Sequence, residues 1–243
     1  MAARATIVSS AILTLGRHRQ RPTLFYVPSL RAAPVWSVAD LPEPHRAPLY
    51  ALEAAAPEIL AEYDVLRADV SSDYSTADPT RQEGEHRLHE GEWSWHSYVK
   101  KGERNAAWAA RCPTTASLLE AVPGLMAHAG AADPFGFAFF STLHPGSTIE
   151  PHTAPCNLRL RCHLPLRVPP GDGCAMELAG ARQPWAEGKL LVFDDCYEHA
   201  VWNRTAEPRV LLLFDLWHPD LAESERAAVR DMFARARAER GAR

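Results

Sequence analysis

The sequence lacks a long hydrophobic run. The longest apolar stretch near its start, residues 5–15, is interrupted by the hydroxyl side chains Thr6, Ser9, Ser10 and Thr14. This stretch is far shorter than the roughly 20 residues that cross a bilayer, so we expect no membrane span. Glycine is also scarce, with 13 glycines against 20 prolines and seven tryptophans. Such a composition favours short elements joined by stiff turns over a helical bundle.

The chain also has no large excess of charge of either sign. The chain of 243 residues has 26 Lys and Arg against 30 Asp and Glu, which gives a formal net charge of −4, and 47% of it is hydrophobic. A chain of this size and composition can bury the core of one globular domain. It has no global positive charge and no evident basic patch with which to hold a polyphosphate, so we expect no nucleic-acid partner.

The spacing of the cysteines along the sequence shows no pairs. The five cysteines are scattered, odd in number and form no CxxC motif; they are Cys112, Cys156, Cys162, Cys174 and Cys196. This arrangement indicates neither a disulfide scaffold nor a zinc knuckle, and it favours a reducing, cytoplasmic location. No Asp or Glu precedes Asp40, a bias that transit peptides share. We therefore separate residues 1–20, a lead-in that is either flexible or used for targeting, from a single domain at 21–243.

Helical patterns lie mainly outside the central part of the chain. The spacing of apolar residues predicts a helix over about 49–66 and a short helix that follows Pro113 and begins at Thr114 or Thr115. The tail from 223 to 243 predicts a surface helix, with apolar contacts at Leu221, Val229, Met232 and Phe233. Residues 71–92 are polar and without an apolar period, and we expect a long loop there, of the kind that is often functional.

From residue 135 onward the pattern changes to short aromatic and aliphatic runs separated by turns. Such runs are typical of strands. We expect strands at 135–143, 147–152, 157–166, 174–178, 189–194, 199–203 and 208–217. Short antiparallel strands in this number make a sandwich or jelly roll, with the N-terminal helices packed outside it. The predicted fold class is therefore mainly β with flanking helices.

One predicted strand, 157–166, has a cationic face. Alternate side chains of a strand share a face, so Arg159, Arg161 and His163 lie on one side and leucines on the other. If the leucines pack against helices, the basic side chains line the interior, where charge is tolerated only when it is paired. The partner is then a protein carboxylate or an anionic ligand. In the alternative reading the basic face is simply wet, as in a half-solvated antiparallel strand.

Two histidines and an arginine stand at the edges of other predicted strands. His152 and His199 are 47 residues apart and could meet across a barrel mouth, and Arg209 follows ten residues after His199. A non-haem Fe(II) oxygenase needs such a set: imidazoles on one face of the metal and a guanidinium that binds the distal carboxylate of an oxo-acid. Spacing alone does not decide, because the chain has eleven histidines and a lone histidine is more often a packed or surface residue.

These segments resemble the aspartyl/asparaginyl β-hydroxylase family of Fe(II)- and 2-oxoglutarate-dependent dioxygenases. The matching phrases, in the family's order, are His144-Pro-Gly, Pro151-His-Thr-Ala-Pro155, Asn157-Leu-Arg-Leu-Arg-Cys-His-Leu-Pro-Leu166, Trp185-Ala-Glu-Gly-Lys189, Val192-Phe-Asp-Asp195, Glu198-His-Ala-Val-Trp-Asn203, Arg209 and Asp215-Leu-Trp-His-Pro-Asp-Leu221. Weaker similarity reaches back to Arg21-Pro and Phe25-Tyr-Val-Pro.

The resemblance implies a double-stranded β-helix, the jelly-roll or cupin-like fold. It implies that His152 and His199 bind iron and that Arg209 binds the distal carboxylate of 2-oxoglutarate. The rest of the co-substrate pocket would be formed by Ser141, Arg161 and His163. The implied cofactors are Fe(II), 2-oxoglutarate as co-substrate and O2. The implied reaction couples decarboxylation of 2-oxoglutarate to hydroxylation of a substrate C–H bond, in the family the β-carbon of a peptide Asp or Asn.

The metal ligands leave alternatives open. Most oxygenases of the wider class have a carboxylate two residues after the first histidine, but here that residue is Ala154, and the family is similar in lacking it. Asp194 or Asp195 could be nominated as a third ligand, although their place at a strand end suits turn formation or the orientation of a ligand imidazole. Cys112 stands alone where animal members of the family have a disulfide, so we expect no such bridge within this chain. The expected absence of a signal peptide, a membrane span and the helical repeats of larger members puts their EGF-like substrate in doubt.

Other functions also fit the residues. A cupin-like metal protein could bind a small acid without oxidising it, and a pseudoenzyme could keep the fold as an interaction module. The substrate of an oxygenase could be a peptide, a protein or a small molecule, and the oligomeric state is open. We expect substrate contacts in the 71–92 loop and in Trp93-Ser-Trp95, and we expect Trp185, Trp202 and Trp217 to pack beneath the site.

Overall fold

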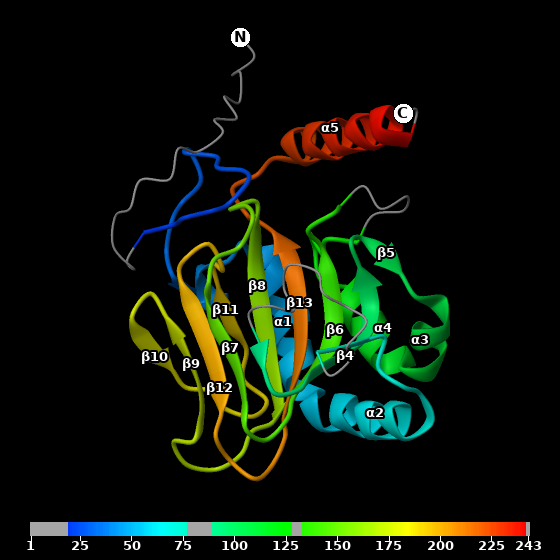
Figure 1. Ribbon diagram of the computed structural model, residues 1–243. Coiled ribbons are helices and arrows are strands. Elements are labelled where there is room, and N and C mark those ends of the chain that lie inside the picture. Colours follow the sequence, from blue (N-terminus) through cyan, green and yellow to red (C-terminus); the bar gives the residue numbers. More distant parts are fainter. Residues whose placement is uncertain (1–18, 77–88, 128–132, 242–243) are drawn as a thin grey trace.

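The structure is a computed structural model, and it describes residues 19–76, 89–127 and 133–241 (Figure 1). Two antiparallel sheets form its framework. The larger sheet has the strand order β1-β11-β8-β13-β6-β4-β2, with β5 paired to β4. Its strands are β1 (Val35–Trp36), β2 (Tyr74–Ser75), β4 (Trp93–Lys100), β5 (Glu103–Arg104), β6 (Phe137–Leu143), β8 (Arg159–Arg167), β11 (Leu191–Phe193) and β13 (Arg209–Trp217).

The smaller sheet has the order β10-β9-β12-β7-β3. Its strands are β3 (His89–Glu90), β7 (Ser147–His152), β9 (Cys174–Leu178), β10 (Ala181–Gln183) and β12 (His199–Asn203). From β6 to β13 the chain crosses from one sheet to the other after each strand, except that β9 and β10 share the smaller sheet. This alternation is the winding of a double-stranded β-helix, or jelly roll. The predicted fold class is confirmed.

The seven predicted strands are confirmed, with ends that differ by at most two residues. The strand β4 was not predicted, although its aromatic residues at alternate positions are typical of a strand. Within the predicted 71–92 loop, the described ends form the short strands β2 and β3, which pair with β4 and β7. Residues 77–88 of that loop, and residues 1–18 of the predicted lead-in, lie outside the described residues.

The predicted helix over 49–66 is wrong in extent, because two helices meet there. They are α1 (Glu43–Ala54) and α2 (Ala56–Asp69). Pro57 lies in the first turn of α2, where its missing N–H costs nothing, whereas in the interior of one long helix it would remove a hydrogen bond. The chain therefore breaks at Ala55, just before the proline.

The short helix after residue 112 is present as α4 (Pro113–Glu120), preceded by α3 (Ala106–Arg111), which was not predicted. The predicted start at Thr114 or Thr115 is wrong, because Pro113 is already helical. The Glu62 carboxylate of α2 accepts the backbone N–H groups of Thr114 and Thr115 at 2.8 and 2.9 Å. A side chain from another helix thus satisfies the donors that a local cap would otherwise bind.

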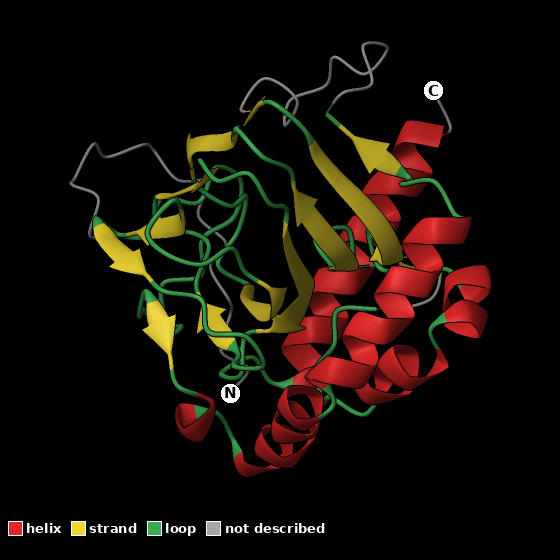
Figure 2. Cartoon of the chain, turned by 90° about the horizontal axis from the view of Figure 1, so that it is seen from below, coloured by secondary structure: helices red, strands yellow, loops and turns green. Residues whose placement is uncertain are grey.

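The helices gather on one side of the larger sheet (Figure 2). Leu160 and Leu164 of β8 share a buried core with Leu49 and Ile59 of the helices. This confirms that the leucine face of β8 packs outward. The opposite face of the sheet, with Arg159, is turned toward the smaller sheet, so the functional side chains lie between the two layers.

The tail forms α5 (Glu223–Gly241), at the end of the barrel where the N-terminal segment also lies (Figure 1). Phe233 packs against Phe25 and Phe135, with ring centroids 5.3 and 5.2 Å apart. Val229 packs against the cluster that contains Leu221, so these predicted contacts of the tail are confirmed. Among the described helices, none combines the length and the apolar character that a membrane crossing needs.

Candidate active site

The two histidines of interest face each other at one end of the smaller sheet. His152 is the last residue of β7, His199 is the first of β12, and the two are register partners. Their ring centroids are 4.1 Å apart, with 52° between the ring planes. Antiparallel pairing brings directly opposed side chains this close. The structure thus brings together the two imidazoles that the sequence places 47 residues apart.

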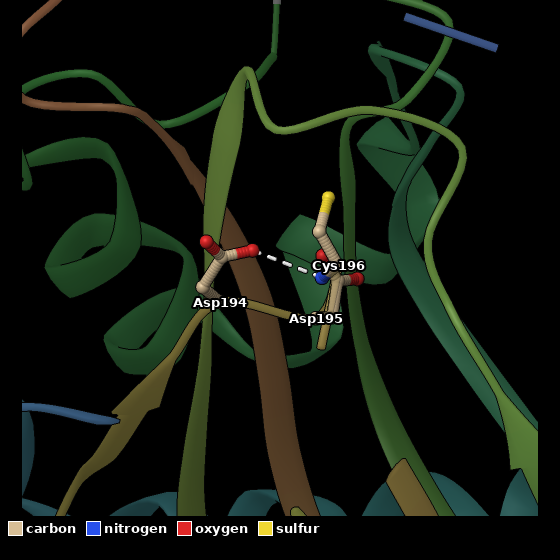
Figure 3. Close-up of side chains that lie close together, drawn as sticks. All are labelled: Asp194, Asp195 and Cys196. Carbon is tan, nitrogen blue, oxygen red and sulfur yellow. Dashed lines mark hydrogen bonds between the residues drawn. The ribbon is translucent and has the colours of Figure 1, made fainter. Parts of the chain in front are cut away.

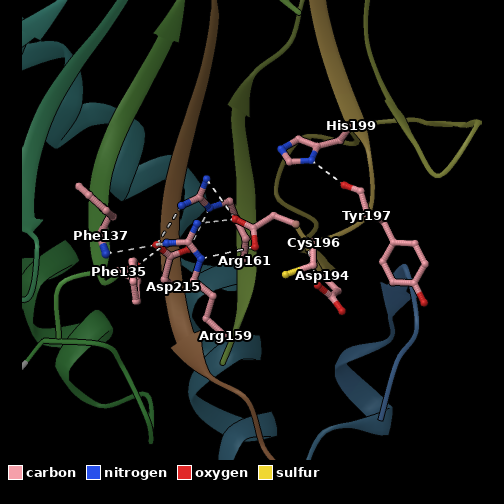
Figure 4. Close-up of polar contacts among 10 residues, drawn as sticks. Phe135, Phe137, Arg159, Arg161, Asp194, Cys196, Tyr197, His199 and Asp215 are labelled. Carbon is pink, nitrogen blue, oxygen red and sulfur yellow. Dashed lines mark hydrogen bonds and ion pairs between the residues drawn. The ribbon is translucent and has the colours of Figure 1, made fainter. Parts of the chain in front are cut away.

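Backbone carbonyls set the proton position on both rings. His152 Nδ1 lies 2.8 Å from the Glu150 oxygen, and His199 Nδ1 lies 2.9 Å from the Tyr197 oxygen (Figure 4). Since a carbonyl only accepts, Nδ1 carries the proton in each ring and the lone pair is on Nε2, the tautomer of a metal ligand. Burial, followed by the nearby His152, lowers the pKa of His199 to about 3. The ring is therefore neutral at physiological pH, as metal binding requires.

The cationic face of β8 is buried and paired with carboxylates. Arg161 binds Asp215 through Nε and Nη2 at 2.9 and 3.0 Å, and Arg159 binds the same carboxylate at 3.1 Å (Figure 4). Asp195 completes the network, at 2.5 Å from Arg159 and 3.4 Å from Arg161. Burial alone would raise the pKa of Asp195, but the two guanidiniums outweigh it and lower the pKa to about 2. The alternative in which solvent covers the basic face of this strand is wrong for Arg159, which is 4% exposed.

Asp194, Asp195 and Cys196 bring potential ligand atoms within 4.8 Å of one another (Figure 3). Each has another role, however. Asp195 is held by the arginines, and Asp194 accepts the Cys196 N–H at 2.9 Å and a hydrogen bond from Gln20. Burial raises the pKa of the Cys196 thiol well above its usual value, so the thiol stays protonated. These contacts favour a turn-forming role for Asp194 and an ion-pairing role for Asp195 over a third metal ligand.

Arg209, the first residue of β13, is a buried charge of a different kind. It is 2% exposed, and its Nη1 donates to the Ser141 hydroxyl at 3.3 Å. Within the described part of the chain, its Nε has no hydrogen-bond partner and no carboxylate forms an ion pair with the guanidinium. Burial lowers the pKa of Arg209 to about 10, which leaves it charged at pH 7. A buried guanidinium without a protein counter-ion fits an anionic ligand.

A continuous row of rings connects the histidine pair to Arg209. The ring of Phe193 lies 5.9 Å from that of His199 and 4.8 Å from that of His163. The ring of Trp185 follows, 6.0 Å from His163 and 5.0 Å from the Arg209 guanidinium. Burial, followed by the Arg209 charge, lowers the pKa of His163 well below its usual value, and its buried Nδ1 has no hydrogen-bond partner among the residues that the structure describes. The histidine pair on the smaller sheet and Arg209 on the larger sheet are therefore linked by one row of interior side chains.

On the inner face of the larger sheet, the part formed by β2, β4 and β6 is aromatic. Trp93 of β4 donates its indole N–H to Ser141 at 2.8 Å, so the hydroxyl that contacts Arg209 is also tied to this strand. Trp95 stacks between Phe139 and Tyr74, at centroid distances of 4.3 and 4.1 Å. We expected substrate contacts from Trp93 and Trp95, but the hydrogen bond to Ser141 was missed. The alternation of the two tryptophans was the available signal, because it puts both on one strand face.

Trp185 packs where it was expected, against His163 and Arg209. The expectation was wrong for Trp217, which belongs to a separate cluster with Leu158, and for Trp202, which is half-buried. Two further histidines of the matching phrases, His144 and His218, contact residues outside the histidine pair. His144 lies 3.1 Å from Ser94, and His218 lies 3.1 Å from the Arg31 carbonyl oxygen.

Together, these features define a jelly-roll protein with a histidine pair at one end of the barrel and an unpaired, buried arginine in its wall. The model of the family described as Aspartyl/Asparaginyl beta-hydroxylase matches residues 53–219. The chain belongs to the aspartyl/asparaginyl β-hydroxylase family, which confirms the resemblance seen in the sequence motifs.

Named relatives agree with this assignment. The chain is 33% identical over 218 residues to aspartate beta-hydroxylase domain-containing protein 2 of Mus musculus, covering 88% of this chain and 60% of the relative. It is 36% identical over 218 residues to domain-containing protein 1 of Homo sapiens, covering 88% and 52%. Aspartyl/asparaginyl beta-hydroxylase of Homo sapiens is 36% identical over 147 residues, which cover 60% of this chain and 19% of that protein. The chain thus spans little more than half the length of the first two relatives.

Solved structures resemble the chain more distantly. A prolyl-4-hydroxylase of Pseudomonas putida is 14% identical, with a TM-score of 0.43, covering 70% of this chain and 88% of its own. An oxidoreductase of the 2OG-Fe(II) oxygenase family from Burkholderia pseudomallei is 17% identical, with a TM-score of 0.44, covering 73% and 93%.

Proposed function

We propose that the chain is an Fe(II)- and 2-oxoglutarate-dependent dioxygenase that hydroxylates a C–H bond, with the β-carbon of an Asp or Asn residue in a peptide or protein as the favoured target. The observation that carries the proposal is Arg209, a buried guanidinium that pairs with none of the described carboxylates and is linked to the histidine pair by the interior row of rings. The names of the relatives support the choice of target.

In this proposal His152 and His199 hold the metal through Nε2. Their Nδ1 contacts with the Glu150 and Tyr197 carbonyls fix the orientation of both rings before any metal arrives. Bound iron would supply the oxygen chemistry, with 2-oxoglutarate as the source of two electrons. The protein supplies binding, orientation and a water-poor interior for that chemistry.

The distal carboxylate of the co-substrate would be bound by Arg209 and Ser141. A charge-assisted contact to a guanidinium is stronger than a neutral hydrogen bond, and burial strengthens it further. His163 has a buried Nδ1 without a hydrogen-bond partner in the described part of the chain, and its ring lies between the two ends of the site, which supports it as a further co-substrate contact. Arg161 is a weaker member of the set, because Asp215 and Asp195 already bind its guanidinium.

One feature favours a second candidate function. Ala154 stands where most oxygenases of the wider class have a carboxylate ligand, so two imidazoles would leave a bound metal less neutralised. A cupin-like protein that binds a metal and a small acid without oxidising it would fit the same residues. A pseudoenzyme would keep the fold and bind neither.

We further propose a cytoplasmic location, which is supported by five buried cysteines that are all free.

The deciding experiment measures succinate formation from 2-oxoglutarate, with and without Fe(II), in the presence of candidate Asp- and Asn-containing peptides. Mass spectrometry of the peptides reports the gain of one oxygen atom. We expect His152→Ala and His199→Ala to abolish Fe(II)-dependent turnover, and His144→Ala, in a turn outside the pair, to keep it. Full turnover by either site variant would remove that histidine from the metal site. Binding of both Fe(II) and 2-oxoglutarate without turnover by any substrate would favour the acid-binding alternative.

A further inference from the structure

A cavity of about 300 Å³ lies beside the barrel wall near Arg209. It is lined by the turn at residues 168–172 after β8, by Cys174 and Ala175 of β9, and by the segment that contains Trp185 between β10 and β11. Arg209 and His163 are not among its lining residues. The cavity is therefore separate from the interior wall that carries the candidate co-substrate contacts.

Trp185 separates the cavity from that wall. Its ring lines the cavity, and it also lies 5.0 Å from the Arg209 guanidinium and 6.0 Å from the His163 ring. Cys174 of β9 also lines the cavity. Burial raises the pKa of its thiol, and the nearby Arg209 charge opposes the rise, which shows that the guanidinium is within electrostatic reach. The Trp185 indole thus contacts both the Arg209 guanidinium and the cavity.

The indole is held in place by packing. Trp185 packs against the apolar cluster that contains Met176, Leu178 and Phe193, and its buried Nε1 has no hydrogen-bond partner in the described residues. Replacing it with a smaller apolar residue therefore breaks no hydrogen bond. The main change is that the space behind the guanidinium opens into the cavity.

We propose that Trp185 sets the length of the acid that Arg209 can bind. The inference rests on the proposed function, in which a 2-oxo dicarboxylate extends from the histidine pair to Arg209. The indole prevents the guanidinium from withdrawing, so the distance between the two ends is fixed. Without the indole, the flexible arginine side chain can move toward the cavity, and a straight-chain 2-oxo dicarboxylate with one more methylene fits. The cavity has ample room, because one water in the liquid occupies about 30 Å³.

The expected effect follows from the value of a methylene group. A pocket that fits one acid discriminates against a homologue with one methylene more or fewer by roughly 10- to 200-fold. Removing the indole should abolish much of that discrimination. We therefore expect the ratio of the dissociation constants of 2-oxoglutarate and 2-oxoadipate to move toward 2-oxoadipate by about tenfold or more.

The test is anaerobic calorimetry on the Fe(II)-loaded full chain, so that binding is measured without turnover. 2-Oxoglutarate and 2-oxoadipate are titrated into the unchanged protein and into Trp185→Ala, Trp185→Leu and Trp185→Phe. Trp202→Ala is the matched control, because Trp202 is half-buried and lies under Arg204, at 5.5 Å, with no ring contact to Arg209. We expect a large shift of the ratio in Trp185→Ala and Trp185→Leu, a smaller shift in Trp185→Phe, and none in Trp202→Ala.

An unchanged ratio in Trp185→Ala would overturn the inference. An equal loss of affinity for both acids would overturn the inference too, because it would show that the indole only supports Arg209. Should circular dichroism show that Trp185→Ala is unfolded, Trp185→Leu decides in the same way. If the unchanged protein binds no 2-oxoglutarate, the proposed function fails and this inference fails with it. If that protein binds 2-oxoglutarate and the ratio does not move, only the role of Trp185 is rejected.

Discussion

The guanidiniums on the inner face of the larger sheet form two groups on neighbouring strands, and the groups differ in their partners. Arg159 and Arg161 of β8 each contact two protein carboxylates. Arg209 of β13 has a hydroxyl and an aromatic ring beside it, and none of the described carboxylates. The first group is a closed structural network, whereas the second has unused binding capacity. We infer that the difference separates support of the barrel from ligand binding.

The energetics of the two groups should also differ. A buried ion pair is costly to break, because removal of one partner leaves the other charge uncompensated. A buried charge without a counter-ion already carries that cost in the folded protein. Substitutions in the two groups should therefore change stability in opposite directions, and the following experiments test this contrast.

The largest effect is expected from Asp215→Ala. This carboxylate accepts from Arg159, from Arg161 and from the Phe137 backbone N–H (Figure 4). Its removal should lower the free energy of unfolding by about 3–5 kcal/mol, as measured by urea denaturation. The control is Asp172→Ala, whose side chain is 95% exposed. A loss as small as that of the control would show that the network does not stabilise the fold.

The second effect is the pH dependence of stability that Asp195 causes. The pKa of Asp195 is lowered to about 2 in the folded protein, so between about pH 4 and 2 the unfolded chain binds more protons than the folded one. Its contribution to stability is therefore complete above about pH 4 and is lost as the pH falls toward 2, with a magnitude of about 2 kcal/mol. Urea denaturation at a series of pH values measures the loss. Asp195→Asn should flatten the curve in this window, and an unchanged slope would contradict the pairing.

The third effect has the opposite sign. Arg209→Met removes a buried charge that has no counter-ion and keeps a side chain of similar length. We expect the free energy of unfolding, measured without ligands, to stay the same or rise by about 1 kcal/mol. Arg161→Met should lower it instead, because Asp215 and Asp195 then lose a partner. Equal losses in both variants would abolish the distinction between the two groups.

The smallest effect is expected from Ser141→Ala. The hydroxyl accepts from Arg209 at 3.3 Å and from the Trp93 indole at 2.8 Å. One neutral hydrogen bond is worth about 0.5–1.5 kcal/mol, so binding of 2-oxoglutarate should weaken by roughly 2- to 12-fold. Ser94→Ala is a control on the same sheet, because Ser94 contacts His144 and is not bonded to Arg209. Calorimetry that gives equal affinities in both variants would remove Ser141 from the pocket.

Much of the fold could be predicted from local sequence. Runs of aromatic and aliphatic residues between turns gave the strands of the barrel, because period and turn chemistry are local signals. The start of α4 could not be predicted, since the group that binds its free N–H donors is Glu62 of another helix. The break at Ala55 was predictable from Pro57 and was missed, because the apolar pattern continued across it.

The candidate site was predictable only where its arrangement follows from local sequence. Strand alternation put Arg159, Arg161 and His163 on one face, but it left the identity of their partners open. The carboxylates that bind the arginines are far from them in the sequence, Asp215 on β13 and Asp195 just after β11, and only the tertiary structure brings them together. The unpaired state of Arg209 has no sequence signal at all. It becomes visible only when the neighbours of the guanidinium are known.

The central claim is that Arg209 binds the co-substrate at a site that also holds iron. The most direct measurement is anaerobic calorimetric titration of 2-oxoglutarate into the Fe(II)-loaded protein and into its Arg209→Met variant. We predict saturable binding to the unchanged protein, weakened at least about 30-fold in the variant, because truncating one partner of a buried charge pair costs about 2–5 kcal/mol. Equal affinities in the two proteins, or no binding to the unchanged one, would contradict the account.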